Sequence, residues 1–141
     1  MSHLSNLITN AKNTLFNAGG STNRMMIIVV IALIPGFLTS SYFFGIGIIV
    51  NVVVCIATCL TVESLILKAR AQPQLTLLDG SALVTAFLIG LCLPPDLPLF
   101  IVILGSAFAI IFGKLLYGGL GHNIFNPAMV GYAALIISFP L

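Results

Sequence analysis

The stretch SALVTAFLIGLCLPPDLP, from Ser81 to Pro98, is an apolar segment too short to cross a bilayer, and it ends in prolines. Its first 13 residues, up to Leu93, would extend about 20 Å as a helix, whereas a hydrocarbon core is about 30 Å thick. Pro94 and Pro95 remove two backbone donors and impose an extended chain. Such backbone at membrane depth is tolerated only where it is buried in protein or lines a cavity. The stretch therefore predicts a broken helix inside a membrane protein.

The composition of the whole chain agrees with a membrane protein. Of its 141 residues, 60% are apolar and 6% are charged, and the mean hydropathy is +1.21. Soluble domains carry about 25% charged residues, so eight charges cannot form a polar surface here. Five lysines and arginines make no basic stripe for nucleic acid. The three cysteines lie in apolar runs without CxxC spacing and far from both histidines, which argues against a disulfide scaffold and a zinc site.

Apolar runs along the chain predict an all-α integral membrane protein. A polar lead over residues 1–23 precedes a membrane domain over residues 24–141. Gly45 and Gly47 are expected in a tight turn, and Asn126 followed by proline is typical of a helix start. The domain is predicted to contain five membrane segments, one of them the short broken helix, at about residues 25–44, 46–67, 81–93, 97–117 and 124–141.

The charged residues support this count and suggest an orientation. All five basic residues fall on the cytoplasmic side if the N-terminus is cytoplasmic, as the positive-inside rule requires. A count of four would place Lys114, which we expect at the membrane interface, on the outer side. An odd number of segments would invert two such halves relative to each other, as in many transporters. The chain is therefore predicted to be one half of an inverted-repeat fold, apparently truncated.

Glu63 is the one acid inside a long apolar run. A charge at the centre of a membrane helix costs roughly 2.5–3.5 kcal/mol on insertion scales, so such residues often mark ion or proton paths. Glu63 is also close in sequence to Lys68 at the basic end of its run, which allows an ordinary interfacial position. The sequence leaves both interpretations open.

Several polar residues near the short segment are further candidates. Asp79 and Ser81 can form a turn and cap the helix, or this helix N-terminus can face an anionic group such as a flavin phosphate. The Thr85 hydroxyl is expected to bond to its own helix backbone. We take Glu63 and Asp79 as candidates for an ion path. We take Ser81, Thr85 and Asn126 as candidates for the lining of a central cofactor cavity, and we predict no complete catalytic set and no metal-binding set.

Two motifs resemble those of a known family. The string LLYGGLGHNIFNPAMVGY, residues 115–132, resembles the YGGLG-N-FNPAM-GY signature of the membrane-embedded D subunit of the Rnf/Rsx electron transport complex. The string DGSALVTA, residues 79–86, with the Leu-Pro-Pro at residues 93–95, resembles the SALLTG…PP segment of the same family. The related B subunit of the Nqr complex shares the pattern more loosely. The resemblance covers about residues 23–141.

The resemblance implies a multi-pass component of a complex in the bacterial inner membrane. Such complexes couple electron transfer to Na⁺ or H⁺ translocation, or keep a redox-sensing regulator reduced in the Rsx form. The family protein is expected to have ten helices in inverted, urea-transporter-like halves. It is also expected to carry FMN, linked through phosphate to a threonine of an S-G-A-T-type motif. No such motif occurs here, so the covalent FMN threonine is expected in a missing C-terminal half.

The implied partners are the other subunits of the Rnf/Rsx complex, the missing C-terminal half and the lipid bilayer, with no nucleic acid. Two alternatives from other classes stay open. A five-segment half with a broken helix is equally typical of a non-redox channel or permease for a small solute. A truncated product without its second half would be inactive.

Overall fold

The structure, a computed structural model, describes residues 20–72, 77, 79–118, 122 and 124–140. Every regular element within these residues is helical, which confirms the all-α class. Most of the predicted polar lead, residues 1–19, lies outside the described part. The elements are α2 (Gly20–Phe44), α3 (Ile46–Ala69), α4 (Ser81–Cys92), α5 (Leu99–Phe108), the π-helix η2 (Ala109–Leu115) and α6 (Pro127–Ser138).

Two of these helices are long and apolar enough to cross a membrane, at Thr22–Phe44 and Ile46–Ala69. The short helix predicted at residues 81–93 is confirmed as α4. The next segment, predicted to span the bilayer over residues 97–117, is shorter: its helical run is Leu99–Leu115, beginning after Pro98. Five membrane segments and an inverted repeat stay predictions.

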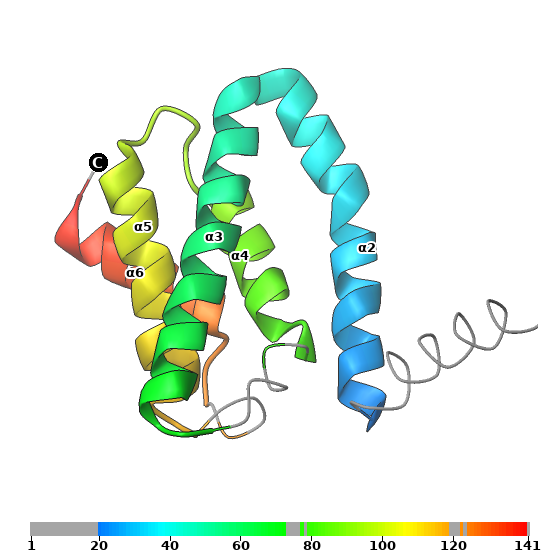
Figure 1. Cartoon of the computed structure of the whole chain (residues 1–141). Helices are drawn as coiled ribbons and strands as arrows, with labels where there is room; N and C mark the ends of the chain where they lie inside the picture. The colour runs from blue at the N-terminus through cyan, green and yellow to red at the C-terminus, as the bar shows by residue number, and fades with distance from the viewer. Residues whose placement is uncertain (1–19, 73–76, 78, 119–121, 123, 141) are drawn as a thin grey trace, which may run out of the picture.

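Successive helices run in alternating directions. In Figure 1, α2 and α4 rise, whereas α3 and α5 descend. The lower end of the bundle therefore gathers the start of α2, the end of α3, the start of α4 and the end of η2, and Asp96 lies at the opposite end, between α4 and α5. Four basic residues belong to this lower end: Arg24, Lys68, Arg70 and Lys114. This grouping agrees with the charge pattern used above, whereas the orientation towards the cytoplasm stays a prediction.

Two glycines were expected in the turn between the first two segments. Gly45 has a φ of +75° and ends α2, as predicted. Gly47 is not in the turn but in the first helical turn of α3, so that part of the prediction was wrong. A Cβ at Gly47 would come within 2.5 Å of the Pro95 carbonyl oxygen, so the glycine is required by close packing against the proline loop.

The proline loop after α4 is extended, as predicted, and is held against α3. Leu93 ends α4 with a ψ of 140°. The Asn51 side chain, only 1% exposed, donates from Nδ2 to the Pro94 carbonyl oxygen at 2.9 Å. Together with a longer bond from the Leu97 N–H at 3.4 Å, this bond satisfies a carbonyl of the extended loop, as non-helical backbone inside a membrane protein requires.

The helix α4 is central and packs against α2, α3, α5 and α6. Gly90 allows a close approach between α4 and α3, because a Cβ there would lie 2.8 Å from the Val52 Cα. Small interface residues of this kind are typical of packed membrane helices. The core between α3, α4 and the α5–η2 helix includes Cys55, Cys59, Ala82, Ala86, Ile89, Val102, Ala109 and Ile110.

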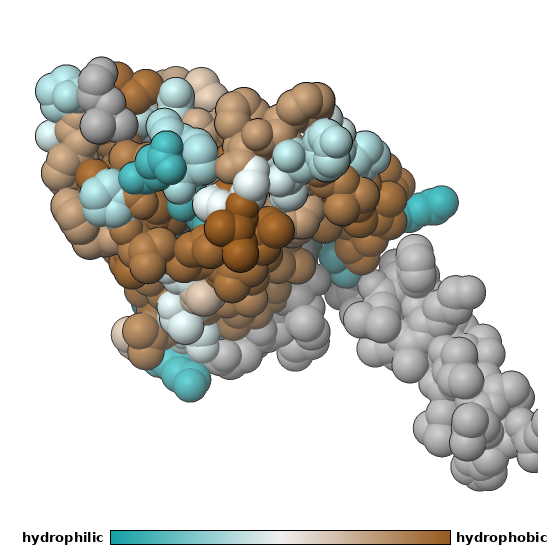
Figure 2. Space-filling view, turned by 90° about the horizontal axis from the view of Figure 1, so that it is seen from above, coloured by the Kyte–Doolittle hydropathy of each residue, from teal (hydrophilic) through white to brown (hydrophobic). Residues whose placement is uncertain are grey.

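The outer surface is strongly apolar. Large hydrophobic side chains are exposed along α2, α3 and α5, including Ile31, Leu38, Val53, Leu65 and Leu104. Seen from the end where α2 passes into α3, brown apolar residues dominate and teal polar residues are scattered (Figure 2). Such a surface suits lipid or neighbouring membrane proteins and not water.

Candidate functional site

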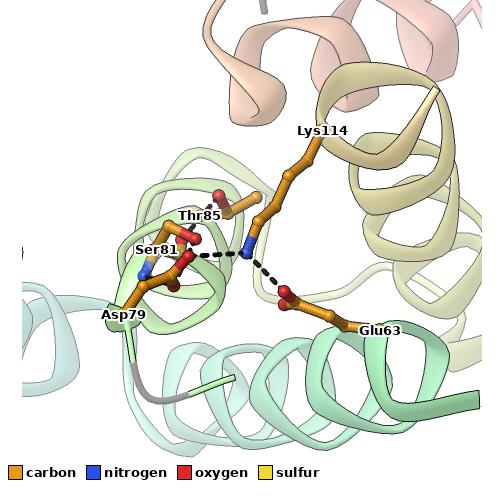
Figure 3. Close-up of polar contacts among 5 residues, drawn as sticks. All are labelled: Glu63, Asp79, Ser81, Thr85 and Lys114. Atoms are coloured by element: carbon orange, nitrogen blue, oxygen red, sulfur yellow. Dashed lines mark hydrogen bonds and ion pairs between the residues drawn. The ribbon is translucent and has the colours of Figure 1, made fainter. Parts of the chain in front are cut away.

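A charged cluster is buried where α3, α4 and η2 meet. Lys114 Nζ donates to Glu63 Oε1 and forms an ion pair with it, and both side chains are 0% exposed. Nζ also lies 3.4 Å from Asp79 Oδ2, whose side chain is 20% exposed. Figure 3 shows the ammonium between the two carboxylates. Two carboxylates therefore share one ammonium.

This arrangement corrects one expectation from the sequence. Lys114 was expected to extend to the membrane interface, but its side chain is buried and points towards α3. Glu63 is buried and pairs with Lys114, whereas its depth in the membrane stays a prediction. Burial of either charge alone is expensive, and pairing each with the other offsets part of that cost. The candidacy of Glu63 for an ion path stays a prediction.

Asp79 is oriented by the start of α4. Its Oδ1 accepts from the Ser81 backbone N–H at 2.8 Å and from the Ser81 hydroxyl at 2.7 Å, which confirms the predicted turn. Gly80 between them has a φ of +76°, a conformation that suits glycine. With Oδ1 engaged in this way, Oδ2 faces Lys114.

Two hydroxyls of α4 lie beside the same ammonium (Figure 3). Ser81 and Thr85 are 4% and 3% exposed. Thr85 Oγ1 donates to the Ser81 carbonyl oxygen at 2.9 Å, as predicted for a hydroxyl inside an apolar helix. Each hydroxyl uses its proton in these bonds, so its oxygen lone pairs still have acceptor capacity.

Lys114 belongs to a π-helical stretch that the sequence did not predict. The wide turn is closed by a bond from the Leu116 N–H to the Ile111 carbonyl oxygen at 2.9 Å. Arg70 Nη1 then donates to the Leu115 carbonyl oxygen at 2.9 Å, tying the end of α3 to the end of η2. Single π-turns inside α-helices are often found at functional sites.

One oxygen of the cluster has no hydrogen-bond donor among the described residues. Glu63 Oε2 is buried and accepts no hydrogen bond from this part of the chain. A buried carboxylate oxygen in this state is unfavourable unless a proton, a water or a cation reaches it. A proton, a water or a cation at Oε2 would satisfy this oxygen.

Asn126 stands at the start of α6. Its Oδ1 accepts from the Ala128 backbone N–H at 3.0 Å and caps α6, so the predicted helix start is confirmed. It lines a small pocket of about 90 Å³ with Leu88 and Ile89 of α4. The structure thus brings Ser81 and Thr85 together with Glu63 and Lys114, whereas the Asn126 side chain bonds within its own helix start, and a shared cofactor cavity stays a prediction.

A groove of about 870 Å³ lies between α5 and α6. That is within the usual size of small-molecule sites. Its lining, however, offers no cationic side chain for a flavin phosphate: Leu104, Gly105, Phe108, Phe125, Met129, Val130, Ala133, Ala134, Leu135, Ile137, Ser138 and Phe139. The residues of this groove do not fit an FMN phosphate.

Comparisons with known proteins give a consistent picture. Residues 9–141 match the model of the NQR2, RnfD, RnfE family. Over 121 residues the chain is 52% identical to the D subunit of the ion-translocating oxidoreductase complex of Aeromonas hydrophila, covering 85% of this chain and 35% of the relative.

Two further relatives carry the same description. The protein of Yersinia enterocolitica is 52% identical over 122 residues, covering 86% of this chain and 35% of the relative. The protein of Escherichia fergusonii is 48% identical over 121 residues, covering 85% and 34%. The chain spans about a third of the length of these curated relatives.

Proposed function

Because the chain belongs to the NQR2, RnfD, RnfE family, we propose that it supplies a membrane portion of an ion-translocating oxidoreductase complex. Its similarity to several proteins described as the D subunit of such a complex carries this proposal. The apolar outer surface supports a place in the membrane beside other subunits. We place the complex in the bacterial inner membrane, with the basic end of the bundle towards the cytoplasm.

In the proposed ion path, the cluster of Glu63, Asp79 and Lys114 lies at this cytoplasmic end. Ionisable side chains inside membrane segments are rare, face the protein interior and often mark ion or proton pathways. Asp79 is partly exposed and Glu63 is fully buried. An ion would therefore reach Asp79 first and Glu63 next.

We place FMN outside this part of the path. The family implies a flavin that supplies one- and two-electron chemistry, but the chain lacks the S-G-A-T motif and the large groove lacks a phosphate partner. We assign any covalent flavin to the part of the protein that this chain does not contain. The described residues contribute charge and positioning.

The test is purification and transport from native membranes. The chain is tagged and extracted in mild detergent, and we expect other redox subunits to copurify. Inverted vesicles should show donor-driven Na⁺ or H⁺ uptake that is lost when the gene is deleted and restored by the wild-type chain. Absence of any copurified redox protein, or uptake unaffected by the deletion, would refute membership of the complex.

Substitutions then test the path. Glu63→Gln and Asp79→Asn should each lower ion uptake per electron transferred, because each removes one negative charge from the cluster. Asp96→Asn is the matched control, since this exposed acid lies at the opposite end of the bundle. If the complex carrying Glu63→Gln does not assemble, the complex carrying Asp79→Asn decides the question. Normal uptake in an assembled Asp79→Asn complex contradicts the path.

A further inference from the structure

We infer that Lys114 is a tethered counter-ion that occupies a binding site for a free monovalent metal cation. This inference deepens the proposed ion path and rests on it. It begins with the position of Nζ, which lies between the carboxylates of Glu63 and Asp79 and beside the hydroxyls of Ser81 and Thr85 (Figure 3). Carboxylate and hydroxyl oxygens are hard ligands, the type that hard metal cations prefer.

The charges of the cluster do not balance. It combines two carboxylates with one ammonium, and Glu63 Oε2 is buried without a donor among the described residues. A cation held by Glu63 Oε2, Asp79 Oδ2 and the two hydroxyl oxygens would satisfy that orphan atom. It would also crowd and repel the Lys114 ammonium, so the two positive species should exclude each other.

The flexibility of the Lys114 side chain would allow its ammonium to withdraw from the cluster. Its ammonium is a compact charge on a flexible four-carbon stem. The side chain projects from the π-helix two residues before Leu116, whose N–H closes the wide turn. π-turns are rare and occur mostly as single turns at functional sites. Asp79, at 20% exposure, gives the cluster its opening towards the end of the bundle.

The consequence is a site with two exclusive states. With Lys114 inserted, the cluster is closed and carries its own cation. With Lys114 withdrawn, the same oxygens hold a metal cation, and the bundle end gains an exposed lysine. Return of Lys114 would expel the metal cation, so the lysine sets the affinity of the site and prevents a cation from remaining there.

The first test uses the unmodified 141-residue chain in lipid nanodiscs. An amine-acylating reagent is applied in sodium chloride or in choline chloride of equal ionic strength, and labelled lysines are quantified by mass spectrometry. If sodium displaces the ammonium, Lys114 labelling rises about fivefold or more, within the usual range of coupling between sites. Lys68, exposed at the same end of the bundle, is the internal control and should not change. Equal Lys114 labelling in sodium, potassium, lithium and choline salts overturns the inference.

The second test uses Lys114→Met and measures radioactive sodium binding. Removal of the competing ammonium should tighten binding about tenfold or more relative to the unmodified chain. Adding Glu63→Gln to this variant should abolish the gain. No gain in folded Lys114→Met overturns the inference, and where this variant does not fold, the labelling result decides.

The two proposals fail separately. Cation-dependent labelling without copurified redox subunits would leave the exchange site standing and refute the proposed complex. A purified, transporting complex whose Lys114 labelling ignores metal cations would support the complex and refute the exchange.

Discussion

Substituting one partner of the buried ion pair should destabilise the protein far more than substituting both partners. Glu63 and Lys114 are both 0% exposed, so neither can transfer its charge to solvent when the other is lost. Removing one partner of a buried pair typically costs about 3–5 kcal/mol, whereas replacing both with apolar residues of similar volume is often nearly neutral. The relevant variants are Glu63→Met, Lys114→Met and the double variant.

The neighbouring carboxylate makes the two single variants unequal. In Glu63→Met, the lysine keeps Asp79 at 3.4 Å, so we expect a loss near the lower limit, about 3 kcal/mol. In Lys114→Met, two carboxylates are left without an ammonium, and the loss should approach about 5 kcal/mol. The double variant leaves Asp79 bonded to Ser81 and partly exposed, and it should be more stable than either single variant.

The assay is unfolding by sodium dodecyl sulfate in mixed micelles, followed by far-ultraviolet circular dichroism. Because the double variant should lose less than either single variant, the double-mutant cycle should give a coupling free energy of more than about 5 kcal/mol. Lys68→Met is the matched control, because this lysine is exposed, and should change stability by less than about 0.5 kcal/mol. Additive single effects, or a double variant less stable than both single variants, would show that the two charges do not pair in the membrane-embedded chain.

Substitutions at Asn51, Gly90 and Asn126, two of them with a matched control, test the packing and capping of the helices with the same unfolding assay. Asn51→Ala removes the buried amide that holds the proline loop and should cost about 1–3 kcal/mol; an unchanged midpoint would show that the loop is held otherwise. Gly90→Ala should cost about 1–3 kcal/mol, because the new methyl meets the backbone of α3, whereas Gly36→Ala, in open space on α2, should be neutral or stabilise by up to about 1 kcal/mol. Equal effects at the two glycines would contradict the close helix contact. Asn126→Ala removes the α6 cap and should cost about 0.5–2 kcal/mol, with Asn126→Asp retaining most of the stability.

Local chemistry explains what the sequence predicted well. The broken helix at residues 81–93 and the extended loop after it follow from the spacing of apolar residues and two adjacent prolines. The α6 start follows from Asn126 and the proline after it. Each of these features depends on neighbours within a few residues, so no knowledge of the tertiary structure was needed.

The charged cluster depends on contacts that sequence spacing does not contain. Lys114 and Glu63 are 51 residues apart, and each has a plausible local role at the end of its own apolar run. The π-helical turn that carries Lys114 also has no signal in the apolar pattern, since AIIFGKL suits an α-helix equally well. One cue was present: an isolated lysine and an isolated acid in separate apolar runs are candidates for pairing.

Burial of Lys114 also weakens the inference of the membrane topology from the positions of the charges. The count of five segments relied on Lys114 as an interfacial charge, but a lysine neutralised by Glu63 contributes little to a positive-inside comparison. Arg24, Lys68 and Arg70 are exposed at the same end and still give that end its positive bias. In the structure η2 and α3 end side by side and α4 begins there, whereas the count of five membrane segments stays a prediction. We therefore assign Lys114 to the proposed counter-ion role in the cluster and leave the positive bias of this end to the three exposed residues.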